Sequence, residues 1–137
     1  VLFLGDYDLT RFGPWYGDRH SDIGQTRESI NLLQRVSAGI VLTGHEAGVF
    51  ERPAASLWDS YREVITEREK KLLAVLEAPK TLAAIVESWI VYGKPRAPKE
   101  FFAFGERAQM KKHLEELQRR GTVILENQIY RKASASR

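Results

Sequence analysis

The sequence contains no cysteine. This absence excludes disulfide bonds, a cysteine nucleophile and metal sites built from thiolates, and it fits an intracellular protein. No apolar run approaches the roughly 20 residues that a membrane-spanning helix needs. The N-terminal residues show neither a basic segment nor a cleavage signal for export. We therefore expect a cytoplasmic protein with no membrane partner.

Three motifs of common active sites are also absent. There is no Gly-x-Ser-x-Gly, the turn that presents the serine of α/β-hydrolases. There is neither a phosphate-binding P-loop nor a Gly-x-Gly-x-x-Gly dinucleotide fingerprint. The sequence therefore gives no support to a Ser-His-Asp hydrolase or to a protein that binds nucleotides through these loops.

The composition is that of a folded protein. Of 137 residues, 43% are hydrophobic and 28% are charged, which suits one ordinary domain or two small ones. The net charge of +3 is unevenly placed. Residues 1–50 contain four arginines against six acidic residues, whereas residues 51–137 contain seventeen basic residues against twelve acidic ones. The second part is therefore the more suitable partner for a polyanion.

Two short apolar segments near the N-terminus each end in glycine and a side chain that can bind metal. Val1–Asp6 ends in Gly-Asp, and Gly39–His45 ends in Gly-His. Apolar runs bounded by glycine predict buried strands, and residues 25–36 have the spacing of a helix packed on a sheet. If the strands are parallel neighbours, Asp6 and His45 emerge at the same edge of the sheet.

Residues 7–20 predict a loop, because they combine two glycines, a proline and four aromatic residues. Two interpretations of the aromatic side chains stay open. They cover the hydrophobic core beneath the loop, or Phe12, Trp15 and Tyr16 form the wall of a cleft beside Asp6. We expect His20, at the end of the loop, to lie at the surface.

From residue 54 onward, apolar side chains recur at helical spacing. Ser56 is a candidate N-cap for a long helix, and Thr81 for a second helix that reaches Ile90. A third helix starts near Phe101 and stops at Gly121. Two β-prone runs then flank an acid-Asn turn, which predicts a hairpin.

The expected architecture is α+β in two parts. Residues 1–53 form a strand-helix-strand region, and residues 54–137 form a helical domain whose hairpin resembles the wing of a winged helix. Such a domain contacts nucleic acid through cations, and four candidates lie near or in the wing: Lys111, Lys112, Arg119 and Arg131. Two glutamates interrupt this basic stripe, so a solvated helix face is the simpler interpretation.

A carboxylate and an imidazole at one sheet edge point to metal chemistry. A carboxylate can bridge two divalent cations, and imidazole nitrogen suits Zn, Fe or Mn. Two metal ions about 3.5–4 Å apart lower the pKa of a bound water and clamp an anionic leaving group. Such a centre needs more ligands than Asp6 and His45. Only His20 and His113 remain among the histidines, and His113 falls in the other domain.

These segments, taken in order, resemble the C-terminal half of a metallo-β-lactamase-fold hydrolase. The most similar branch carries an appended winged-helix-like domain and includes β-lactamase-like hydrolases and a mitochondrial endoribonuclease. The resemblance covers nearly the whole chain. It rests on the Gly-Asp and Gly-His strands, on the predicted winged helix and on the residues Arg62, Arg68, Leu72 and Leu73 of the helix between them.

The resemblance implies a fold, a site and a reaction. The fold is the C-terminal part of an αββα sandwich, followed by the winged helix. Asp6 would bridge two divalent ions, Zn or alternatively Fe or Mn, and His45 would bind the second ion. Hydrolysis by a metal-bound hydroxide would act on an ester, a thioester, an amide or a phosphodiester.

The family's main motif, His-x-His-x-Asp-His, and a further histidine ligand lie upstream of the matching region. We therefore expect the chain to be a piece of a longer hydrolase that contains no complete catalytic set and holds metal partially or not at all. The expected partners are the missing N-terminal half and a second copy of the chain. Two alternatives stay open: a winged helix that binds nucleic acid, or a dimerisation module built on the helices around Trp58 and Trp89.

Overall fold

The computed structural model describes residues 1–46 and 48–134 and has a mixed α+β architecture, as expected. Its contacts divide the chain into two compact units. Unit 1 comprises Val1–Tyr16 and His20–Glu67, and unit 2 comprises Gly17–Arg19 and the described residues from Arg68 onward. The domain boundary after residue 53 stays a prediction.

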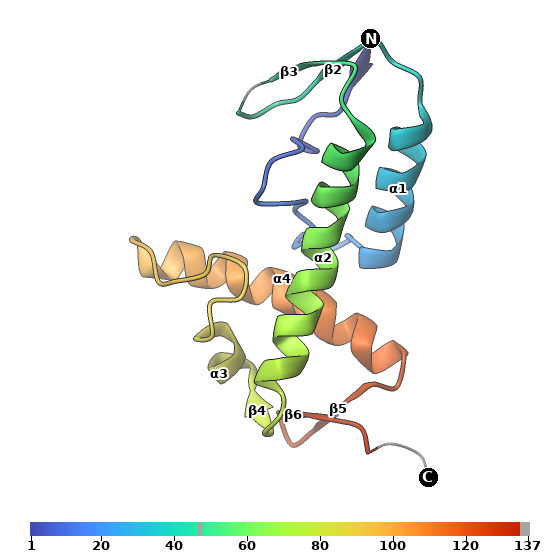
Figure 1. Cartoon of the computed structure of the whole chain (residues 1–137). Coiled ribbons are helices and arrows are strands. Elements are labelled where there is room, and N and C mark those ends of the chain that lie inside the picture. The colour runs from blue at the N-terminus through green and yellow to red at the C-terminus, as the bar shows by residue number, and fades with distance from the viewer. Residues whose placement is uncertain (47, 135–137) are drawn as a thin grey trace. The chain divides into compact units, whose positions relative to one another are not determined.

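Unit 1 is built on a small mixed sheet (Figure 1). In the described residues, β1 pairs in parallel with β2, and β2 pairs antiparallel with β3. Helix α1 connects the two parallel strands, and the first part of α2 lies beside it (Figure 1). The elements are β1 (Leu2–Phe3), α1 (Ile23–Arg35), β2 (Ile40–Leu42), β3 (Val49–Glu51) and α2 (Ala55–Val75), of which residues 55–67 belong to this unit.

Helix α1 begins two residues earlier than the sequence predicted, because Asp22 caps it. The Asp22 Oδ1 atom accepts a hydrogen bond of 2.9 Å from the backbone N–H of Gln25, which satisfies one of the free donors of the first turn. Ile23 and Ile30 are buried, and Leu33 packs against them, whereas the side chain of Leu32 is 65% exposed. The buried stripe therefore follows Ile30 and Leu33 and excludes Leu32.

The sheet of unit 1 has one covered face and one open face. Leu2, Val41 and Phe50 are cross-strand neighbours that belong to or pack against the core of the unit. Because successive side chains alternate between faces, the adjacent residues point the other way. Phe3 is 75% exposed and Val49 is 56% exposed. The open face of the sheet is thus apolar and largely uncovered.

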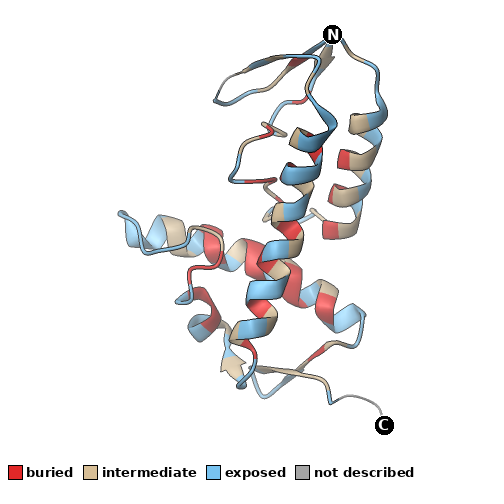
Figure 2. Cartoon of the chain, in the orientation of Figure 1, coloured by how far each residue is buried: buried red, intermediate tan, exposed pale blue. Residues whose placement is uncertain are grey.

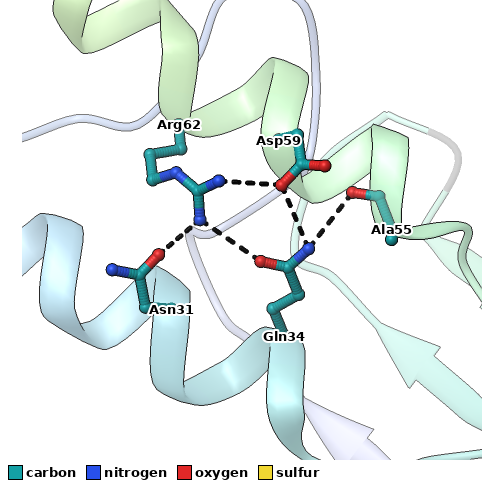
Figure 3. Close-up of polar contacts among 5 residues, drawn as sticks. All are labelled: Asn31, Gln34, Ala55, Asp59 and Arg62. Carbon is teal, nitrogen blue, oxygen red and sulfur yellow. Dashed lines mark hydrogen bonds and ion pairs between the residues drawn. The ribbon is translucent and has the colours of Figure 1, made fainter.

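A polar network ties α1 to α2 (Figure 3). The Arg62 guanidinium donates hydrogen bonds to the side-chain oxygens of Asn31 and Gln34 and pairs with the Asp59 carboxylate at 2.8 Å. The Gln34 amide in turn donates to Asp59 Oδ1 at 3.1 Å and to the carbonyl of Ala55 at 3.3 Å. The network fixes the register of the two helices, which supports the sheet beneath them.

Unit 2 contains the rest of α2, two further helices and a second small sheet (Figure 1). In the described residues the strand order is β4-β6-β5, and both pairings are antiparallel. A compact hydrophobic core lies under α4 and includes Leu72, Ile85, Met110, Leu114 and Leu117. The elements are β4 (Lys80–Thr81), α3 (Leu82–Val86), α4 (Lys99–Arg119), β5 (Val123–Glu126) and β6 (Ile129–Lys132).

Several predicted signals of the second part are confirmed. The Thr81 hydroxyl caps α3 by accepting from the N–H of Ala84 at 3.2 Å. Gly121 follows α4 at a φ of +70°, and the bonds from its N–H and that of the next residue form a Schellman motif. The hairpin turns at Asn127 and Gln128, whose positive φ values of 48° and 63° are those of a type I′ turn.

Two predictions about helix ends were wrong. Helix α2 begins at Ala55, so Ser56 lies in its first turn and does not cap it. Helix α3 ends at Val86, although apolar spacing continues to Ile90. The chain leaves the helix because Trp89 adopts a φ of +49°, and a carboxylate from α4 binds the backbone just beyond.

That carboxylate belongs to a row of buried polar residues on α4, which comprises Glu106, Gln109 and His113. Figure 2 shows the buried parts of this helix in red. Glu106 is fully buried and accepts hydrogen bonds from the N–H groups of Val91 at 2.9 Å and Tyr92 at 3.3 Å. Burial raises the pKa of Glu106, while these N–H groups and the Arg68 guanidinium oppose the shift. Arg68 also donates to Gln109 Oε1 at 3.0 Å. The row holds the segment after α3 against α4.

Candidate metal-binding edge and basic groove

The structure brings Asp6 and His45 together at one edge of the sheet of unit 1. Strands β1 and β2 run parallel with Phe3 opposite Leu42, so both chains leave the sheet on the same side. The His45 Nε2 atom lies 3.3 Å from Asp6 Oδ1. This is the juxtaposition that the two Gly-containing strands predicted.

Glycine at the strand ends permits this close approach. The Gly44 N–H donates to the carbonyl of Gly5 at 2.8 Å and extends the ladder past the strands. A Cβ atom on Gly44 would lie 3.2 Å from that carbonyl oxygen and 3.7 Å from Asp6 Oδ1. A larger residue at position 44 would therefore press on the strand end that carries Asp6.

A short turn then orients His45. The Thr43 hydroxyl donates to the carbonyl of His45 at 3.0 Å, and the Thr43 N–H donates to the carbonyl of Gly48 at 2.9 Å. These two bonds close the backbone around residue 45. His45 is therefore held by its own turn as well as by the strand before it.

The pair fits one metal ion in geometry and chemistry. Ligand atoms about 2.0–2.1 Å from a tetrahedral zinc ion lie on the order of 3.3 Å from one another, and the nitrogen and oxygen here are separated by 3.3 Å. Imidazole nitrogen and carboxylate oxygen are common zinc, iron and manganese ligands. The side chains are 61% and 89% exposed, so an ion could reach them from solvent.

Two ligands do not complete a centre. Within residues 1–46 and 48–134, no group of three or more His, Asp or Glu side chains could hold a metal ion. The two remaining histidines lie elsewhere: His20 is exposed on unit 1, as predicted, and His113 is fully buried in the core of unit 2. Among the described residues, Asp6 and His45 therefore form a pair of candidate ligands and not a complete set.

The aromatic residues of the loop after Asp6 divide into two groups. Tyr16 is fully buried in the core of unit 1, so its ring packs that core. Phe12 is 39% exposed, and Trp15 is half-buried. Contact of Phe12 and Trp15 with a substrate stays a prediction.

The four predicted nucleic-acid contacts also divide. Arg119 pairs with Glu116 at 2.7 Å, and Arg131 pairs with Glu126 at 3.1 Å. Lys111 and Lys112 instead line a concave surface of unit 2, which we call the α4 groove. Sequence reasoning missed three other lining residues that bear on its chemistry, Arg19, Phe104 and Arg107.

No family model matches the sequence, and a search of curated proteins finds no match either.

In the part of the chain that the structure describes, no helix is both long enough and apolar enough to cross a membrane.

Proposed function

We propose that the chain is the C-terminal part of a metal-dependent hydrolase of the metallo-β-lactamase superfamily. The observation that carries this proposal is the 3.3 Å approach of His45 Nε2 to Asp6 Oδ1 at the ends of parallel strands. Asp6 would supply a carboxylate oxygen to the metal centre, and His45 would supply an imidazole nitrogen. Zinc, or alternatively iron or manganese, suits this donor set.

The open sheet face supports a larger parent fold. Phe3 and Val49 project from the face opposite the core, and Leu42 lies between them in register. An apolar sheet face of this kind is stable when another layer covers it. In the proposed αββα sandwich, the second sheet of the N-terminal half covers this face and supplies the remaining metal ligands.

The second unit supports the branch with an appended domain. Its elements follow the order helix, strand, helix, helix and hairpin, and β4 pairs with β6, the second strand of the hairpin, which is the central strand of this sheet. This order suits a winged helix in which β5 and β6 form the wing. The winged helix then serves as an accessory domain of the hydrolase.

The chemistry follows from the exposed donor pair. Metal ions bound at such a site supply a water of lowered pKa and polarise a substrate oxygen. Asp6 and His45 hold their donor atoms in place through the Gly44–Gly5 ladder bond and the Thr43 turn. The substrate classes that suit this chemistry are esters, thioesters, amides and phosphodiesters.

The test uses the chain extended upstream by the N-terminal half of the parent protein. We expect about two metal ions per molecule by elemental analysis, together with hydrolysis of a generic phosphodiester or thioester. Asp6→Ala and His45→Ala should each lower the metal content and abolish hydrolysis. Asp18→Ala and His20→Ala are matched controls, because both residues are exposed and neither belongs to the donor pair.

Two results of this test would contradict the proposal. If the extended protein binds no metal, or if the two ligand variants retain the metal content of the controls, the proposal is wrong. The 137-residue chain alone should bind zinc only weakly in calorimetry, because two ligands leave the ion's coordination incomplete.

A further inference from the structure

The α4 groove lies within unit 2, between helix α4 and the segment Gly17–Arg19. It encloses about 390 Å³. The Lys112 ammonium donates a hydrogen bond of 3.0 Å to the carbonyl of Arg19 and so joins this segment to the helix. The groove is thus a built feature of the unit, formed by residues far apart in the sequence.

Its charge is strongly one-sided. Four cationic side chains line the groove, and Glu115 is the one acidic residue among its described lining residues. Glu115 lies 3.8 Å from Lys112. Within the described residues, the side chains of Arg19, Arg107 and Lys111 form no ion pair. Three cations therefore remain available to an anionic ligand.

An exposed aromatic ring completes the surface. Phe104 lines the groove from the second turn of α4 and is 69% exposed. Arg107 follows Phe104 by three residues, and Lys111 follows Arg107 by four, so the ring and the two cations share one side of α4. The Phe104 ring is therefore accessible to a planar group that approaches the cations of the groove.

We propose that the α4 groove binds single-stranded nucleic acid. A base stacks on Phe104, because every base has a flat face and stacking on an aromatic side chain tolerates any sequence. The adjacent phosphates pair with Arg19, Arg107 and Lys111. This site does not depend on the metal-binding edge.

The groove suits a single strand better than a duplex or a membrane. In a duplex the bases are stacked on each other and are not free to cover a side chain. A membrane surface offers anionic headgroups but no planar group for the ring. The wing and the last turn of α4 are weaker candidates, because Arg131 of the wing is already paired with Glu126 and Arg119 of α4 with Glu116.

The test measures binding of the whole chain to a fluorescein-labelled 15-nucleotide oligouridylate by anisotropy. Three phosphate contacts predict a plot of log K against log salt concentration with a slope of about −2, since each contact on a single strand contributes about −0.7. Phe104→Ala should weaken binding roughly tenfold to a hundredfold, as loss of one stacked base does. Lys111→Ala should weaken binding and make the slope shallower by about 0.7.

Two variants are matched controls. Phe101→Ala removes a ring that is 66% exposed one helical turn earlier and does not line the groove. Arg131→Ala removes a wing cation that is engaged in an ion pair. Both should bind within about twofold of the unaltered chain. Circular dichroism of each variant checks that the fold is intact, which the exposure of Phe101, Phe104 and Lys111 and the partial exposure of Arg131 favour.

Three results would overturn the proposal. The first is equal binding by Phe104→Ala and Phe101→Ala. The second is binding that a double-stranded competitor displaces as well as a single-stranded one does. The third is sedimentation with phosphatidylserine vesicles, lost in Lys111→Ala, without any binding of the oligonucleotide.

Discussion

The loop that follows Asp6 is anchored by a glycine that packs directly on helix α2. Gly13 adopts a φ of +82°, and a Cβ atom built on it would lie 2.6 Å from both Cβ and Cγ1 of Val64. The loop reaches this position through a turn in which the Gly13 N–H donates to the carbonyl of Thr10 at 3.1 Å. Replacement by alanine therefore affects the backbone conformation and the packing together.

The magnitude follows from these two effects. A residue with a Cβ atom in the left-handed region costs about 1–2 kcal/mol, and an added carbon in a filled space costs about 1–3 kcal/mol. Val64 cannot rotate away, because its nearest atom is its own Cβ and its χ1 is restricted in a helix. We expect Gly13→Ala to lower the free energy of unfolding by about 2–5 kcal/mol.

The assay is urea unfolding followed by tryptophan fluorescence. Gly39→Ala is the control, because a Cβ atom at position 39 meets nothing within 4 Å. It should change the stability by less than about 0.5 kcal/mol. If Gly13→Ala proves as stable as Gly39→Ala, the loop does not pack on α2 as described, and the placement of the residues after Asp6 would have to be revised.

Two further predictions concern the polar networks. Arg62→Ala should lower the free energy of unfolding, measured in urea, by about 1–2 kcal/mol, because it removes the hydrogen bonds from α2 to Asn31 and Gln34 of α1. Replacement of the exposed Arg35 by alanine should have little effect in the same assay. Equal losses in the two variants would contradict the role of the network. Burial raises the pKa of Glu106, so the folded state binds the proton more tightly than the unfolded state does. Protonated Glu106 therefore adds to the free energy of unfolding at low pH. This contribution is lost as the pH rises above about 4.3, where a glutamate of the unfolded chain titrates. Glu106→Gln should therefore show a smaller fall in stability with rising pH than the unaltered chain, measured by urea unfolding at several pH values; identical pH profiles would show that Glu106 is not buried as an acid.

The sequence predicted what depends on neighbouring residues. The two Gly-terminated strands placed Asp6 and His45 at one edge because parallel pairing follows from a strand-helix-strand order. Gly121 and the residues of the hairpin turn act through their own backbone angles, so a short window of sequence is enough to find them.

What the sequence did not reveal depends on residues far apart in the chain. Helix α3 ends early where Glu106, fifteen positions after Val91, accepts the N–H of that residue. The α4 groove requires Arg19 beside Lys112, which are 93 positions apart. The spacing of apolar residues cannot predict either contact, because both are made by polar groups that the fold brings together.

The buried row on α4 also explains why the groove is presented to solvent. One side of the helix carries the buried residues Glu106, Gln109 and His113. Another side carries Phe104, Arg107 and Lys111, each of which lies two positions before one of the buried residues. Two positions correspond to a rotation of roughly 200°, so the two sets lie on nearly opposite faces. Rotation of α4 about its axis would expose Met110 and remove Glu106 from the N–H groups of Val91 and Tyr92, and unpaired buried polar groups are costly. The buried row therefore fixes the rotation of α4 and, with it, the face on which Phe104 and its cations meet a ligand.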